Sequence, residues 1–376
     1  MRILYVGRNA RIGGGSTFRL NVSRGLIARG HQIWLAALPG EVLPRYREVG
    51  VQYVWTPPAP WGGPWILNAI RKHQIDLVHA SNTTPGQAAE WACLRSGTPM
   101  VMSIHGILGK NDHLQSCLQL ARRIISFEEV AIRNLEVHAG RIDPNKLILL
   151  RRPIEHRPQF PREDGEFRVV GVGRLSRRKG QNALNLLAGF QAFRQTVPNS
   201  SLKLLGDGTL LKELRRAAAS YNQAAGRTVV EVLGAVPEPV PIVGQAHVLV
   251  GASYCALEAI MQGVAVIGAG FQGYGPIHAE NLRDAMAWNF GDVGPSQWEM
   301  SADNFRDALL HLHMAWTANQ DRERYWRLDR LIEEDHALER VAQRLEAIYE
   351  SVLRGEAPRR EPGADPAAAQ LGAPSA

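Results

Sequence analysis

Cysteine is scarce in this sequence, which has three among 376 residues: Cys93, Cys117 and Cys255. Because their number is odd and their spacing suits neither a disulfide framework nor a zinc site, we expect a reducing compartment such as the cytoplasm. A long hydrophobic run is also missing. The most apolar stretch, residues 248–267, contains Glu258 and Gln262, so it predicts two strands and a helix rather than a membrane span. The apolar segment at residues 1–7 is too short for the core of a signal peptide.

Several nucleotide-binding patterns are absent as well. The sequence has no Gly-x4-Gly-Lys-Ser/Thr loop, which disfavours an ATPase. The triple glycine at residues 13–15 lacks the strict Gly-x-Gly-x-x-Gly spacing, and residues 32–38 end without the acid that holds a dinucleotide ribose, which disfavours an NAD-dependent oxidoreductase. We find no nucleic-acid module and no stripe of basic and aromatic residues, so nucleic acid is not an expected partner.

The chain does contain two successive series of alternating strands and helices. Its length exceeds the ~250–300 residues that a single core usually reaches, and 45% of the residues are hydrophobic. In the first series we expect strands at 3–6, 32–38, 76–79 and 99–104, helices at 17–29 and 88–94, and a turn at 81–86. In the second we expect strands at 167–172, 202–205, 229–233, 248–250 and 265–267, and helices at 181–195, 210–219 and 257–262. This alternation predicts an α/β protein with two doubly wound, Rossmann-like domains.

The domain boundaries follow from composition. The segment 153–166 is rich in proline and charge and is the expected linker between domains at 1–152 and 167–335. Residues 336–354 have apolar residues at helical spacing, which predicts a further helix. Residues 355–376 contain almost no large apolar side chain, which predicts a disordered tail.

Charge is unevenly distributed along the chain. Residues 1–152 hold 19 Lys and Arg against 9 Asp and Glu, whereas the remainder holds 24 against 27. A basic first half suggests an anionic partner such as a membrane surface or an acidic acceptor. An ordinary solvated basic face explains the same pattern equally well.

The segment Gly173–Gly180 is the strongest candidate binding loop. It joins the strand 167–172 to the helix 181–195, and it brings Arg174, Lys179 and a helix N-terminus together. All three favour an anion, and a diphosphate fits best. A basic surface turn is the alternative.

Other candidates also lie at the carboxyl ends of strands, where open parallel sheets bind ligands. In the first domain, Gly14 and Gly15 would let a ligand approach the backbone, and His105 could donate to a hydroxyl or stabilise developing charge. Each has a purely structural alternative, a tight turn or a structural histidine.

In the second domain, Gly206 and Gly234 end strands, and Glu258 is expected at the start of a helix, where it could accept hydrogen bonds from a ribose. The alternatives are simple turns for the two glycines and, for Glu258, a solvated carboxylate at a helix start.

The order and spacing of these segments resemble glycosyltransferase family 4, whose members have the two-domain GT-B fold. The resemblance covers residues 1 to about 353. It rests on the glycine loop with Leu26-Ile-Ala-Arg-Gly-His31, and on Asp76-Leu-Val-His79, Ser103-Ile-His-Gly106, Val172-Gly-Arg-Leu175 with Lys179-Gly180, Leu205-Gly-Asp-Gly208, and Leu257-Glu-Ala259 with Gly263.

The resemblance implies two domains facing across a cleft, with the helix at 336–354 crossing back to the first domain. It implies that Arg174 and Lys179 bind the donor diphosphate, that Gly234 and the residues after it border the base and that Glu258 holds the ribose. Gly206 is a further expected backbone contact with the donor. Gly14, Gly15 and His105 would contact the donor from the first domain.

By the same resemblance, the protein is a retaining, metal-independent hexosyltransferase without a cofactor, whose donor is a UDP- or GDP-sugar. The acceptor is not implied. We expect a lipid, a polysaccharide or a small molecule as acceptor, in the synthesis of the cell envelope or of surface glycans. The expected location is the cytoplasm, with peripheral contact to the inner face of the membrane. One departure favours an alternative, a GT-B binding or assembly protein without turnover: many members have a glutamate eight positions before Glu258, where this sequence has Val250.

Overall fold

The structure is a computed structural model that describes residues 1–108, 115–138, 142–155, 164–176, 181–319 and 321–358. The chain forms two compact units. The first unit comprises Met1–Pro153 and Asp335–Ala376, and the second comprises Ile154–Glu334. The boundary after Pro153 lies at the start of the segment 153–166 that composition indicates as a linker.

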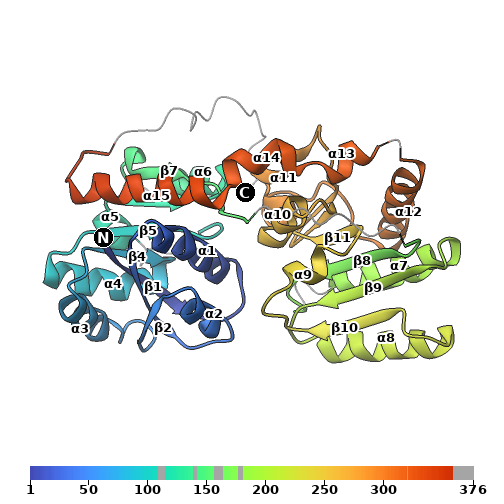
Figure 1. Cartoon of the computed structure of the whole chain (residues 1–376), viewed down its shortest axis with the longest axis horizontal. Helices are drawn as coiled ribbons and strands as arrows, with labels where there is room; N and C mark the ends of the chain where they lie inside the picture. Colours follow the sequence, from blue (N-terminus) through green and yellow to red (C-terminus); the bar gives the residue numbers. More distant parts are fainter. Residues whose placement is uncertain (109–114, 139–141, 156–163, 177–180, 320, 359–376) are drawn as a thin grey trace. The chain divides into compact units, whose positions relative to one another are not determined.

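The first unit is built on a parallel sheet of seven strands in the order β3-β2-β1-β4-β5-β6-β7 (Figure 1). The strands are β1 (Arg2–Asn9), β2 (Gln32–Leu38), β3 (Gln52–Trp55), β4 (Leu77–Ser81), β5 (Met100–Ser103), β6 (Arg123–Ser126) and β7 (Leu147–Leu149). All residues of β4, β5 and β6 are buried. Such fully buried strands are typical of a parallel sheet that helices cover on both faces.

Helices cover both faces of this sheet. They are α1 (Gly14–Ala28), α2 (Leu43–Glu48), α3 (Gly63–His73), α4 (Thr83–Ser96), α5 (Gln115–Leu120), α6 (Glu129–His138) and α15 (Leu338–Leu353), with a 3-10 turn η2 at Pro144–Lys146. Alternate residues of β1 point to opposite faces. Leu4 and Val6 join the core formed with α3, α4 and α5, whereas the Tyr5 hydroxyl lies 3.0 Å from that of Tyr349 on α15.

The second unit contains a six-stranded sheet in the order β10-β9-β8-β11-β12-β13, in which only β13 is antiparallel to its neighbour. Its strands are β8 (Phe167–Val172), β9 (Ser200–Leu205), β10 (Val230–Gly234), β11 (Val248–Gly251), β12 (Ala265–Ala269) and β13 (Gly273–Pro276). Both sheets have the strand order of doubly wound folds, so the predicted α/β class with two Rossmann-like domains is confirmed.

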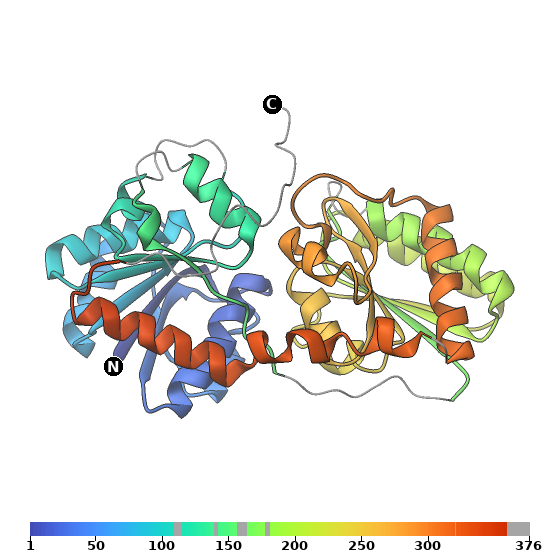
Figure 2. The same cartoon turned by 90° about the horizontal axis from the view of Figure 1, so that it is seen from above.

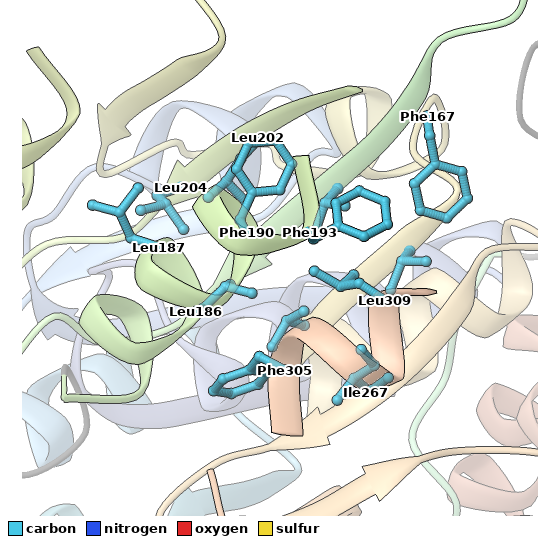
Figure 3. Close-up of a cluster of buried hydrophobic side chains, with 14 of the residues drawn as sticks. Phe167, Leu186, Leu187, Phe190, Phe193, Leu202, Leu204, Ile267, Phe305 and Leu309 are labelled. Carbon is cyan, nitrogen blue, oxygen red and sulfur yellow. The ribbon is translucent and has the colours of Figure 1, made fainter. Parts of the chain in front are cut away.

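This part of the chain also contains the helices α7 (Gln181–Thr196), α8 (Leu211–Ala225), α9 (Val240–Val243), α10 (Tyr254–Met261), α11 (Leu282–Ala287), α12 (Ala302–Ala318), α13 (Arg322–Trp326) and α14 (Asp329–His336), with a 3-10 turn η3 at Asn289–Gly291. Helices α7, α8, α10 and α13 contact the six-stranded sheet, and the last helix of this part of the chain, α14, runs past the unit boundary at Glu334. Figure 3 shows the core where α7 and α12 meet the strands, with Phe190, Phe193 and Phe305 fully buried.

Helix α15 belongs to the first unit although it follows the second unit in sequence, and it lies along the first unit in both views (Figures 1 and 2). Glu346 accepts from Arg29 Nε and lies 2.6 Å from His31 Nε2. Beyond the helix, the backbone carbonyl of Glu356 accepts a 3.1 Å hydrogen bond from the buried Arg123. The segment predicted as a disordered tail therefore starts with residues that have defined contacts, and its residues 359–376 lie outside the described part.

Two predicted boundaries are wrong for a common reason. Residues 81–86 were expected to form a turn, but α4 begins at Thr83 and contains Pro85. The helix 17–29 begins at Gly14, three residues early. The first backbone N–H groups of a helix have no partner within the helix, so proline and glycine are tolerated in the first turn. They were misread as signals that break a helix.

Candidate functional site

The loop after β8 presents Arg174 to solvent. Gly173 and Arg174 are exposed, and Arg174 has no hydrogen bond or ion pair with the described residues. The loop is fixed on both sides, because the Gly173 N–H donates to the Leu205 carbonyl and the Leu175 N–H donates to the Asp207 carbonyl. The guanidinium is therefore available to an anion at a fixed place in the second unit. Lys179, its predicted companion, lies outside the described residues.

A pocket of about 110 Å³ opens beside this loop, at the carboxyl ends of β8, β9, β11 and β12. Its polar and small residues include Gly173, Arg174, Asn182, Ala252, Ser253, Cys255, Gly270 and Asp292. Asn182 donates from Nδ2 to the Gly270 carbonyl at 2.6 Å, which ties the start of α7 to the end of β12. The volume is smaller than the ~300–1,000 Å³ of a whole ligand pocket, so this part accommodates a fragment such as a phosphate or a ribose.

Unusual backbone conformations gather at the pocket where α10 begins. Ser253, Asn289 and Phe290 all have positive φ angles, of 61°, 51° and 58°. The Ser253 N–H donates to the Asn289 carbonyl at 3.1 Å, and Asn289 Nδ2 donates to Ser253 Oγ at 3.2 Å. Each such residue costs about 1–3 kcal/mol, and such strain clusters at binding sites. Sequence reasoning missed this pair.

Gly206 and Gly234 support the same region through the backbone. Gly206 has φ +146°, and a Cβ there would lie 1.8 Å from the Gly173 carbonyl oxygen. Its N–H donates to the carbonyl of Gly234, which has φ +79°. Only glycine permits β9 to approach the Arg174 loop this closely. Neither glycine lines the described pocket, so their predicted contact with a ligand stays a prediction.

The sequence suggested that Glu258 lies at the start of a helix, but the structure places it elsewhere. Helix α10 begins at Tyr254, so Glu258 lies one turn inside it and is half-buried. The described wall of the pocket does not include Glu258. Ser253, held by Asn289, occupies the position before the first helical residue, where its side chain makes no hydrogen bond to the helix. The predicted ribose contact of Glu258 stays a prediction.

In the first unit, the structure brings the glycine loop and His105 together. Gly14 and Gly15 form the first turn of α1 after Gly13. A Cβ at Gly15 would lie 3.9 Å from the His105 ring, so no large side chain separates this helix start from His105. The His105 N–H donates to Asn82 Oδ1 at 2.8 Å, which fixes the backbone after β5.

The His105 side chain is held between aromatic rings and next to two cations. Its ring centroid lies 5.3 Å from that of Phe18 and 4.7 Å from that of Phe127. Burial, with Arg152 and Arg19 nearby, holds the pKa of His105 well below its usual value, so the imidazole is neutral at physiological pH. Nε2 lies 3.2 Å from Ser103 Oγ, whereas the buried Nδ1 has no partner among the described residues. This nitrogen can donate to, or accept from, a ligand hydroxyl.

The two cations near His105 were not predicted as site residues. Arg19 is 4% exposed and donates to the Asn9 carbonyl and to Ser16 Oγ, each at 3.1 Å. Arg152 is equally buried, is paired with Glu128 and lies over the Phe127 ring at 4.8 Å. Their positive charge disfavours a proton on His105.

The described residues form neither a clustered metal site nor a membrane-spanning helix. No group of three or more His, Cys, Asp and Glu side chains among them is placed to hold a metal ion. Within the same residues, no helix combines the length and apolar character needed to span a bilayer.

Comparisons with known proteins agree with this architecture. Residues 12–157 match the model of Glycosyltransferase Family 4. An uncharacterized glycosyltransferase, YqgM of Bacillus subtilis (strain 168), is 26% identical over 167 residues, which is 40% of this chain and 44% of that protein's length. The resemblance to glycosyltransferase family 4 is thereby confirmed, and the family match lies in the first unit.

Solved structures share the fold over nearly the whole chain. A glycosyltransferase from Rickettsia africae ESF-5 superposes with a TM-score of 0.70 at 13% identity, covering 94% of this chain and 99% of that one. Anabaena Alr3699/HepE in complex with UDP gives 0.67 at 15% identity, covering 93% and 100%. At these identities the likeness concerns the fold alone.

Proposed function

We propose that this protein is a glycosyltransferase that moves a sugar from a nucleotide-diphosphate donor to an acceptor hydroxyl. The observation that carries the proposal is the pocket at the strand ends of the second unit, where the exposed Arg174 meets the start of α7. An unpaired guanidinium beside a helix N-terminus suits a diphosphate. The family match of residues 12–157 supports sugar transfer as the reaction.

The proposed chemistry is a retaining transfer. The bond between the anomeric carbon and the diphosphate oxygen breaks, and the acceptor oxygen bonds to the same face of the sugar. The acceptor proton passes to the departing diphosphate. Arg174, with Lys179, stabilises the negative charge that develops on the leaving group, as a fixed cation does in a low-dielectric site. This electrostatic role is the basis for proposing a metal-independent hexosyltransferase without a cofactor.

The remaining predicted residues have proposed roles at the donor. Gly14 and Gly15 offer backbone N–H groups from the first turn of α1, and the neutral His105 hydrogen-bonds a sugar hydroxyl through Nδ1. Glu258 is proposed to hold the ribose. Gly206 and Gly234 act by keeping the backbone of the pocket in place.

For the donor we propose a UDP-sugar ahead of a GDP-sugar, since the similar Anabaena protein was solved with UDP. The proposed acceptor is a lipid, a polysaccharide or a small molecule of the cell envelope. The proposed location is the cytoplasm, with peripheral contact to an anionic membrane, which the basic first 152 residues favour.

The test is a donor screen followed by a charge deletion. Thermal shifts with UDP-, GDP-, ADP- and dTDP-sugars identify the donor, and release of the nucleoside diphosphate measures turnover. We expect Arg174→Ala to reduce turnover at least about 100-fold, as removal of one group that stabilises a transition state does. Arg216→Ala, an exposed α8 arginine that does not line the described pocket, is the matched control and should leave turnover unchanged.

The outcomes separate two kinds of protein. Binding of nucleotide without release from any sugar donor or acceptor would refute sugar transfer and indicate a binding or assembly protein. Equal turnover in Arg174→Ala and Arg216→Ala would refute the proposed diphosphate site.

A further inference from the structure

Four tryptophans of the first unit are exposed together. They are Trp55 at the end of β3 (50% exposed), Trp61 in the following loop (72%), Trp65 on α3 (45%) and Trp91 on α4 (36%). With Pro57, Pro60 and Pro64 they line a hollow of about 520 Å³. We call these seven residues the tryptophan surface.

This much exposed indole is unusual for a surface without a partner. A tryptophan side chain offers roughly 150–250 Å², so the four together leave an apolar patch of a few hundred Å². Patches of this size mark places where proteins or membranes bind. The Trp55 and Trp65 rings lie 6.0 Å apart, edge to face, and therefore form one continuous surface.

Cations border the tryptophan surface on both helices. On α3, Trp65, Asn68 and Lys72 are exposed at a spacing of three and four residues, which places them on one helix face. Arg71 beside them is exposed as well. On α4, the Arg95 guanidinium lies 3.9 Å from the centre of the Trp91 ring. Helices α3 and α4 pack side by side (Figure 1), so the basic and aromatic groups share an outer surface.

Basic residues outnumber unpaired acidic residues in the segment that carries this surface. Between residues 52 and 98 the acidic residues are Asp76 and Glu90. Asp76 pairs with Arg2 at 3.1 Å, whereas Glu90 accepts a hydrogen bond from the neutral Ser116 at 2.9 Å and keeps its charge. Arg71, Lys72 and Arg95 outweigh this one carboxylate and favour an anionic partner.

The chemistry of the hollow favours a lipid surface over a glycan. Its described lining is tryptophan and proline only, whereas a sugar site needs several converging polar groups. Indole rings prefer the headgroup level of a bilayer, and nearby Lys and Arg bind anionic headgroups. We propose that the tryptophan surface docks the first unit on an anionic lipid bilayer, with Trp61 and Trp65 entering the headgroup region and Arg71, Lys72 and Arg95 contacting lipid phosphates.

The inference assigns the membrane contact of the proposed function to a specific surface, and it rests on that part of the proposed function. It does not depend on sugar transfer. The experiment is flotation of the full chain with vesicles of phosphatidylcholine containing 30% phosphatidylglycerol, and with phosphatidylcholine alone. We expect Trp61→Ser/Trp65→Ser to weaken binding to anionic vesicles at least about 10-fold through the lost apolar contact. Met314→Ser, at a 59% exposed apolar residue of α12, is the control and should bind as the unchanged protein does.

A second variant tests the charges. Arg71→Gln/Lys72→Gln should weaken binding about 25-fold at low salt, since each cation near an anionic surface contributes about fivefold, and the difference should shrink at 0.5 M salt. Circular dichroism and urea unfolding establish that each variant is folded.

The inference is overturned if the unchanged protein does not bind vesicles, or if Trp61→Ser/Trp65→Ser binds them equally well. A soluble dimer of the unchanged protein that is absent in Trp61→Ser/Trp65→Ser would also overturn it, because the surface would then be a protein interface. Donor turnover is measured on the same samples. Intact turnover without vesicle binding refutes the docking surface alone, and vesicle binding without turnover refutes the proposed reaction alone.

Discussion

Replacing Gly206 with alanine adds a single methyl group, but it should strongly disturb the pocket of the second unit. The new Cβ would lie 1.8 Å from the Gly173 carbonyl oxygen, whereas real Cβ contacts are essentially never under 3.0 Å. The loop that carries Arg174 must therefore move by more than about 1 Å. Overpacking of this kind costs about 1–3 kcal/mol, and alanine at φ +146° adds about 1–2 kcal/mol of backbone strain. We expect the free energy of unfolding to fall by about 2–5 kcal/mol.

A matched substitution separates backbone strain from the steric effect. Gly226 ends α8 with φ +64°, and no atom lies within 4 Å of a Cβ built there. Gly226→Ala should therefore cost only about 1 kcal/mol and leave donor binding unchanged. Gly173→Ala, which has open space and an ordinary φ, should be tolerated.

Urea unfolding and titration with the nucleotide found in the donor screen measure both effects. We expect Gly206→Ala to weaken nucleotide binding at least about 10-fold, because a 1 Å displacement of a positioned cation is enough to lose a binding contact. If Gly206→Ala loses less than about 1 kcal/mol and binds nucleotide normally, the packing of Gly206 against Gly173 does not position the Arg174 loop.

Three further expectations concern buried polar groups. The Tyr349 hydroxyl lies 2.5 Å from His79 Nδ1, so Tyr349→Phe leaves a buried nitrogen unpaired and should lower the free energy of unfolding by about 1–3 kcal/mol in a urea titration. Burial lowers the pKa of His247 to about 4 in the folded protein, so the unfolded state binds the proton more readily and acidification destabilises the fold. Between pH 7.5 and 5.5 the loss of stability should be about 1 kcal/mol smaller in His247→Asn than in the unchanged chain. His105→Ala removes the hydrogen bond proposed to the donor sugar, which contributes about 0.5–1.5 kcal/mol, so donor affinity in a binding titration should weaken about 2- to 12-fold and turnover should fall with it.

Much of the fold could be predicted from local patterns. The strands expected at 32–38 and 167–172 agree with β2 and β8 residue for residue, because buried parallel strands are short apolar runs with clear ends. The start predicted at residue 181 agrees with α7, whereas the starts of α1, α4 and α10 were placed too late. The first turn of a helix admits Gly13–Gly15 or Pro85 at little cost, and contacts distant in sequence decide where the helix begins.

The candidate site likewise contains residues that could be predicted from the sequence and residues that could not. Arg174 could be predicted, since a charged residue directly after a strand lies at the ligand-binding edge of a parallel sheet. The strained pair Ser253 and Asn289 could not, because it depends on one backbone and one side-chain hydrogen bond between segments 36 residues apart. Neither residue is a glycine, so the sequence gives no sign of a positive φ.

The environment of His105 shows how such distant contacts decide chemistry. Sequence identifies a histidine after a strand but not its charge, which depends first on burial and then on Arg152 after β7 and Arg19 from α1. Arg19 stands between the apolar Phe18 and Leu20 and is as buried as they are. Burial, together with these two fixed cations beside the ring, keeps His105 neutral. A neutral imidazole can hydrogen-bond a hydroxyl without adding positive charge beside an electron-deficient sugar carbon, and this state is compatible with the role proposed for His105.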